Sequence, residues 1–120
     1  LTGAIIVSLG TFTTGVFSNC DEKYIELEKA CKKHGERVWR MPIDEEFIED
    51  LKSDVADFKH MGARWGGAIT AAKFLEIFAE DIPWTHMDIA GTAYNNSSKW
   101  YKKGASGVHV RGLYEYCKNR

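Results

Sequence analysis

The sequence lacks several features that would each point to a particular class of protein. No apolar run approaches the roughly 20 residues that a membrane-spanning helix needs. The net charge is −1, from 16 basic and 17 acidic residues, so no overall field favours nucleic acid or an anionic membrane. The three cysteines, Cys20, Cys31 and Cys117, are odd in number and form no CxxC pair. We therefore expect free thiols, a reducing compartment and no disulfide framework.

Common catalytic motifs are also missing. The sequence has no HExxH, no His-x-x-Cys, no nucleophile elbow, and no phosphate-binding loop in the glycine-bearing segment 10–15. His86 and Asp88 lie two apart on a predicted strand and therefore share a face, either as half of a metal site or as a polar strand end with satisfied hydrogen bonds. Asp54 and Asp57 lie three apart, but nothing in the sequence indicates a cleft around them.

Two further segments allow more than one interpretation. Residues 61–67 combine glycines with Arg64 and Trp65, which suits either a clamp around a ligand or a tight turn before the next helix. The overlapping patterns Asn95-Asn96-Ser97 and Asn96-Ser97-Ser98 match the N-glycosylation acceptor. Because that pattern is short and common, we interpret both matches as chance.

The pattern of apolar and polar residues along the chain predicts one α/β domain. The apolar residues 1–9 predict a strand buried on both faces, and shorter strands are expected at residues 16–18, 38–41 and 84–90. Helices are expected from Asn19 or Asp21 to Gly35, after Asp44, at residues 68–78 and at residues 107–118, with a polar loop over residues 91–106. This alternation predicts part of a mixed, mostly parallel sheet flanked by helices. Because proteins seldom begin inside a core strand, we expect a fragment with an incomplete domain.

Several short motifs, in order along nearly the whole chain, resemble those of one family. They are Leu1-Thr2-Gly3-Ala4, Trp39-Arg40-Met41-Pro42, Ser53-Asp54-Val55-Ala56-Asp57, residues 66–75, Trp84-Thr85-His86-Met87-Asp88-Ile89-Ala90-Gly91, and Lys103-Gly104-Ala105-Ser106-Gly107. The chain is similar to the leucyl aminopeptidase (cytosol aminopeptidase) family. The resemblance implies that residues 1–120 are the C-terminal portion of its catalytic domain, without the upstream metal-binding segment.

What the family does is implied only by this resemblance. The expected activity is removal of N-terminal residues, often leucine, from peptide substrates. Two divalent metal ions (zinc, manganese or magnesium) would activate the attacking water, with a lysine, an arginine and a bound bicarbonate assisting. The family's ligand segments are absent from this sequence and belong upstream of Leu1, so no residue here is assigned as catalytic or metal-binding. A homohexamer in the cytoplasm is expected, together with the upstream part of the same protein.

Four residues are implied to bind substrate. Leu1 matches the residue whose backbone faces the bicarbonate and the peptide, and Gly3 matches the one whose amide binds the peptide beyond the cleaved bond. Ala90 and Ala93 match positions that line the pocket for the N-terminal side chain, where small residues leave room for leucine. Ordinary small-residue packing at a strand end is the alternative for both alanines.

Two other functions remain open at this point. A family member that has lost its metal ligands could persist as a non-catalytic structural homologue, and this segment would look the same. A stand-alone binding module is disfavoured, because the expected incomplete sheet implies missing partners. We expect the chain alone to be poorly folded and prone to association.

Overall fold

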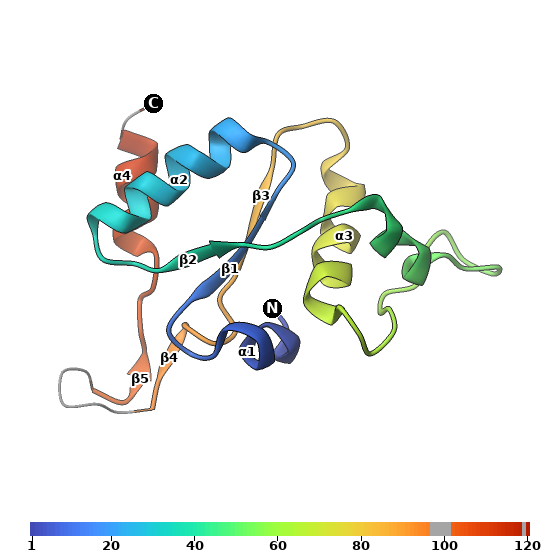
Figure 1. The fold of residues 1–120 in the computed structure, drawn as a ribbon, viewed down its shortest axis with the longest axis horizontal. Coiled ribbons are helices and arrows are strands. Elements are labelled where there is room, and N and C mark those ends of the chain that lie inside the picture. The colour runs from blue at the N-terminus through green and yellow to red at the C-terminus, as the bar shows by residue number, and fades with distance from the viewer. Residues whose placement is uncertain (97–101, 119) are drawn as a thin grey trace.

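The computed structural model describes residues 1–96, 102–118 and 120, and the elements in it surround a small sheet (Figure 1). The helices are α1 (Gly3–Leu9), α2 (Asp21–Lys33), the 3-10 helix η1 (Glu45–Leu51), α3 (Gly67–Ala79) and α4 (Val110–Lys118). The strands are β1 (Thr14–Ser18), β2 (Val38–Arg40), β3 (Thr85–Asp88), β4 (Tyr94–Asn95) and β5 (Gly104–Ala105). Strand β1 is central, parallel to β2 and antiparallel to β3, while β4 and β5 form a separate antiparallel pair.

Helices cover both faces of the three-stranded sheet. Successive strand residues point to opposite faces, and Val16 and Phe17, both fully buried, belong to different core clusters. Phe17 packs with Ile5 of α1 and with residues of α3, whereas Val16 packs with the apolar side of α2. Figure 1 shows the same division, with α2 and α4 together on one side of the sheet and α3 on the other. The predicted α/β fold, a mixed sheet flanked by helices, is confirmed.

The strand predicted for residues 1–9 is wrong, because this segment forms helix α1. An apolar run of this length does not distinguish a buried strand from a helix by periodicity alone. The decisive signals are polar and local: the Thr2 side chain accepts a hydrogen bond from the Ile5 amide, and Gly10 ends the helix at φ 69° with its N–H bonded to the Ile6 carbonyl. The strand that is buried at every residue is β1.

The remaining predicted elements are present with shifted ends. The short strands expected at residues 16–18, 38–41 and 84–90 correspond to β1, β2 and β3. Asp44 precedes η1 but makes no capping bond with its side chain, and the turns that follow are 3-10 turns. Helix α4 begins at residue 110, later than expected, and the predicted polar loop contains β4 and β5. In the part of the chain that the structure describes, no helix is long and apolar enough to cross a membrane.

Candidate functional site

The buried carboxylate of Asp88, at the end of β3, holds the start of the chain in place. Its oxygens accept hydrogen bonds from the Thr2 amide at 3.2 Å, from the Thr2 hydroxyl at 2.8 Å and from the Ala90 amide at 3.2 Å. The backbone nitrogen of Leu1 also donates to this carboxylate. A single side chain, 1% exposed, therefore fixes residues 1–2 beside residues 88–90.

A second contact fixes the other end of α1 against the same segment. A Cβ atom built on Gly91 would lie far inside van der Waals contact with the Gly10 carbonyl oxygen, and 3.4 Å from a carbon of Ile6. Only glycine permits this approach of two backbones. Helix α1 is thus attached at its N-terminus through Asp88 and at its C-terminus through Gly91.

Replacing Gly91 with alanine is expected to destabilise the protein and to loosen α1. Because the clash is with backbone atoms rather than with a flexible side chain, relief requires α1 and the turn to separate, at a cost of about 1–3 kcal/mol. Thermal unfolding and hydrogen exchange of residues 3–10 would measure the effect. Gly67→Ala is the matched control, since its new Cβ would lie at an ordinary 3.5 Å from the Ala4 side chain. Equal effects of the two substitutions would contradict this account.

The four predicted substrate residues lie around this junction. Leu1 is 64% exposed, and a Cβ added at Gly3 would meet nothing within 4 Å apart from its chain neighbours and its own helix, so the backbone there is open to approach. Ala90 packs against the core cluster that contains Ile5 and Phe17. The amide of Ala93 donates to the Ile89 carbonyl at 2.8 Å, and its carbonyl accepts from the Ser106 amide at 2.9 Å. The hydrogen bonds of Asp88 hold the segment of Leu1 and Gly3 next to Ala90. Ala93 lies in the turn that follows, which is closed by its bond to Ile89.

His86 lies on β3 next to this junction, and its environment favours the neutral ring. It stacks on Phe17 with the ring centroids 5.6 Å apart, and its Nε2 atom is buried with no hydrogen-bond partner among the described residues. Burial lowers the pKa of His86, against the opposing charge of Asp88, which raises it. Both oxygens of Asp88 already accept hydrogen bonds. Of the two interpretations of His86 and Asp88, a polar strand end with satisfied hydrogen bonds therefore fits better than half of a metal site.

We expect His86 to make the protein sensitive to mild acid. A histidine whose folded pKa lies below its unfolded value stabilises the fold above that unfolded value, and the contribution is lost as the pH falls toward the folded pKa. The loss of melting temperature between about pH 7.5 and about pH 5.5 should therefore be smaller for His86→Gln than for the wild type. His60→Gln is the control, because His60 is exposed. An identical pH profile for the wild type and His86→Gln would refute this prediction.

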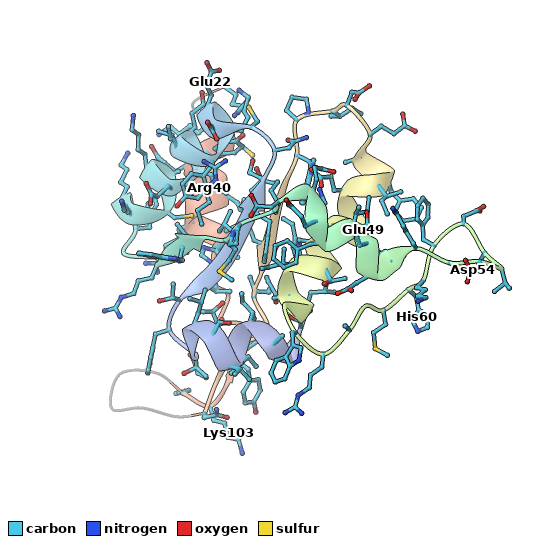
Figure 2. All side chains as sticks on the ribbon, turned by 45° about the vertical axis from the view of Figure 1, so that its right-hand side comes forward. Glu22, Arg40, Glu49, Asp54, His60 and Lys103 are labelled. Atoms are coloured by element: carbon cyan, nitrogen blue, oxygen red, sulfur yellow. The ribbon has the colours of Figure 1, made fainter. Side chains whose placement is uncertain are left out.

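The other segments singled out in the sequence stand apart from the junction. Gly66 adopts φ 65° directly before α3, so residues 61–67 include the predicted turn, and the Arg64 guanidinium lies 4.8 Å from the Trp65 ring centroid. Figure 2 shows Asp54 and His60 on a loop that extends away from the sheet, and Asp54 and Asp57 are both exposed. Ser97 and Ser98 of the glycosylation patterns fall outside the described residues.

Lys73 and His109 are buried polar groups that the sequence did not predict. Lys73 of α3 is 2% exposed and pairs with Glu45 of η1 at 2.8 Å and with Glu76 at 2.5 Å, which joins the two helices. On the opposite face of the sheet, His109 is also 2% exposed and lies within 3.6 Å of Cys31. Neither has a sequence signal, since a lone lysine on a helix or a lone histidine before one is usually exposed or half-buried.

Comparison with known proteins identifies the family to which this fold and junction belong. The model described as "Cytosol aminopeptidase family, catalytic domain" matches residues 1–114. The chain belongs to this family. The predicted resemblance is therefore confirmed over nearly the whole sequence.

Individual relatives agree with the family match. The chain is 46% identical over 120 residues to a probable cytosol aminopeptidase of Acidobacterium capsulatum, covering 99% of this chain and 24% of the relative. It is 50% identical over 120 residues to the one of Chloroherpeton thalassium, with the same coverage. A solved structure of a tomato leucine aminopeptidase mutant matches with a TM-score of 0.93 and 40% identity, over 100% of this chain and 23% of that one. The chain thus spans about a quarter of the length of these relatives.

Proposed function

We propose that this chain is the C-terminal portion of the catalytic domain of a metal-dependent aminopeptidase, which hydrolyses leucine-like N-terminal residues from peptides. In this proposal the chain supplies one wall of the substrate pocket and part of the oligomer scaffold. The observation that carries it is the junction at Asp88, where the backbone of Leu1 and Gly3 lies beside Ala90. Family membership and relatives named as aminopeptidases support the reaction class.

Each part of the junction has a role in this proposal. The Gly3 backbone is approachable because only its chain neighbours and its own helix lie within 4 Å of an added Cβ, and it would bind the peptide beyond the cleaved bond. Ala90 and Ala93 would face the N-terminal side chain of the substrate, with the Ala93 backbone held by two hydrogen bonds. Asp88 is a positioning residue, because it sets where Leu1 and Ala90 lie without itself contacting substrate.

The two divalent ions of the proposed reaction do not fit the residues of this junction. The buried carboxylate of the junction is that of Asp88, and both of its oxygens already accept hydrogen bonds from backbone amides and from the Thr2 hydroxyl. We therefore place the ligands of both ions, whether zinc, manganese or magnesium, in the upstream part of the same protein. A bicarbonate near Leu1 belongs to the same proposal.

Exposed apolar side chains support contacts with more protein than this chain contains. The exposed fractions are 90% for Val7, 77% for Trp65 and 67% for Phe78. Val7 and Trp65 line one open cavity, so this part of the exposed apolar surface is contiguous, and contiguous exposed patches usually mark interaction surfaces. We assign these surfaces to the upstream part of the protein and to other copies in a homohexamer, and we place the protein in the cytoplasm.

The test is hydrolysis by the full-length protein of leucine p-nitroanilide, with N-acetyl-leucine p-nitroanilide as the blocked control. We expect release of nitroaniline only from the free amine, loss of activity after dialysis against a chelator, and recovery with Mn²⁺ or Zn²⁺. A full-length protein that stays inactive with every added metal would instead be the second candidate, a non-catalytic structural homologue without intact metal ligands.

A further inference from the structure

Three potential metal ligands converge where α2 and α4 pack together, on the face of the sheet opposite α3. Cys31 comes from α2, Glu36 from the loop after it, and His109 from the residue before α4. His109 Nδ1 lies 3.6 Å from Cys31 Sγ and 3.5 Å from Glu36 Oε2, and the three ligand atoms all lie within 4.8 Å of one another. Cys31 and His109 are buried, and the Glu36 side chain is 14% exposed.

We propose that Cys31, Glu36 and His109 bind one zinc ion. With Zn–S of about 2.3 Å and Zn–N and Zn–O of about 2.1 Å, a tetrahedral ion separates sulfur from nitrogen by about 3.6 Å and nitrogen from oxygen by about 3.4 Å. Two of the three separations in the structure, 3.6 Å from His109 Nδ1 to Cys31 Sγ and 3.5 Å from His109 Nδ1 to Glu36 Oε2, are close to these edges. The third, between the ligand atoms of Cys31 and Glu36, lies within 4.8 Å, so binding would draw these two side chains around the ion.

The chemistry of the three ligands selects zinc over the harder divalent ions. A thiolate and an imidazole suit Zn²⁺, whereas Mg²⁺ and Mn²⁺ prefer oxygen ligands. Coordination requires the Cys31 thiol to release its proton to solvent, so the bound state contains one thiolate, one carboxylate and a neutral imidazole. Their two negative charges balance the ion, and the buried site carries no net charge.

The surrounding contacts orient two of the ligands as metal sites usually require. The other ring nitrogen of His109, Nε2, lies 2.6 Å from the Thr14 hydroxyl oxygen, which leaves Nδ1 facing the cluster. The Glu36 Oε2 atom accepts a hydrogen bond from the Gly112 amide at 3.0 Å. Such outer contacts fix the tautomer and direction of a ligating histidine and of a carboxylate.

The backbone adopts uncommon geometry to bring these groups together. His109 has φ 63°, a left-handed conformation that is uncommon for residues other than glycine, although histidine adopts it more often than most. A Cβ added at Gly112 would lie 2.9 Å from Cys31 Sγ and closer still to Glu36 Oε2. The absence of a side chain at residue 112 therefore allows α4 to approach the cluster.

One of the three ligands, Glu36, also borders a solvent-accessible cavity. Glu36 lines a cavity of about 320 Å³ together with Thr92, Ser106 and Val108. A water molecule from this cavity would complete the tetrahedron as the fourth ligand. From His109 the contacts continue to Thr14 and then to Thr92, whose hydroxyl lies 2.7 Å from that of Thr14. Zinc would therefore stabilise both the α2–α4 packing and the turn that contains Ala93.

The test uses the full-length protein loaded with Zn²⁺ alone, and with Co²⁺ alone. X-ray absorption of the zinc form should show a sulfur neighbour at about 2.3 Å, and the cobalt form should show sulfur-to-cobalt charge-transfer absorption. Cys31→Ser and His109→Asn should each bind one zinc fewer per chain, and Cys31→Ser should lose both sulfur signals. Asparagine is chosen because it tolerates the left-handed backbone. Cys117→Ser, which removes an exposed thiol, is the control and should leave all three readings unchanged.

The wild type alone can overturn the proposal, whatever the variants do to folding. A wild-type protein without a sulfur neighbour to zinc and without the cobalt absorption would mean that the cluster is only hydrogen-bonded. Sulfur signals that persist in Cys31→Ser, or that disappear in Cys117→Ser, would also overturn it. None of these readings depends on peptidase activity, so failure here leaves the proposed function intact, and the reverse also holds.

Discussion

Replacing Asp88 with asparagine is expected to lower the free energy of unfolding by about 3 kcal/mol, because hydrogen bonds to a buried charged group contribute about 1.5–3 kcal/mol each. In asparagine an NH2 group replaces one carboxylate oxygen and would face the N–H groups that now donate to it. The backbone amides of Thr2 and Ala90 would therefore lose an acceptor. Activity on leucyl substrates should fall about 100-fold, since the same free energy holds the proposed pocket together. Urea unfolding, together with hydrogen exchange of residues 2–10, measures both the size and the location of the effect.

Acid should remove the difference between the wild type and this variant. Burial raises the pKa of Asp88, but hydrogen bonds from the backbone nitrogen of Leu1, from Thr2 and from the Ala90 amide outweigh it and lower the pKa below the usual value. A carboxyl whose folded pKa is lowered stabilises the fold fully above about pH 4, and the contribution is lost as the pH falls through the folded value. Asp57→Asn, at an exposed position, is the matched control. A gap in stability that persists at low pH would contradict this assignment.

Replacing Ala93 with leucine is expected to weaken the proposed preference for large N-terminal side chains. The added side chain would fill space otherwise left for a substrate leucine, and misfit in an apolar pocket costs about 1–3 kcal/mol per methylene. We expect kcat/KM for leucine p-nitroanilide to fall at least about tenfold, with a smaller change for alanine p-nitroanilide. Ala93 is preferred to Ala90 for this test because Ala90 also packs against the core.

The control for this substitution is Ala56→Leu, which adds the same side chain to an exposed loop. It should leave the ratio of kcat/KM values for the leucyl and alanyl substrates unchanged. An Ala93→Leu protein that loses both activities equally would indicate a disturbed fold. One that retains the wild-type ratio would remove Ala93 from the pocket.

The sequence predicted the fold class well, but not the start of the chain. Alternation of short apolar segments with amphipathic ones identified β1, β2, β3 and α3, because burial imposes those patterns directly. The apolar run of residues 1–9 carries no clear period, so it does not distinguish a buried strand from a helix. The Thr2 cap and the Gly10 stop are the residues that favour a helix there.

The candidate site was only partly predictable for a different reason. The resemblance named Leu1, Gly3, Ala90 and Ala93, but it did not indicate that Asp88 joins them, since the bonds from Thr2 span 86 positions in the sequence. The Cys31 and His109 pair is separated by 78 positions and has no ligand spacing that could be recognised. Contacts of this range depend on how helices pack on the sheet, which a single sequence does not specify.

The most direct test of the account is a crystal structure of the full-length protein with leucine hydroxamate bound. We expect the leucine side chain to lie against Ala90 and Ala93 and a polar group of the ligand to lie at the backbone of Leu1 and Gly3. Asp88 should remain hydrogen-bonded to Thr2. A hydroxamate bound elsewhere, with the junction at Asp88 away from the ligand, would contradict the central claim that this junction is a wall of the substrate pocket.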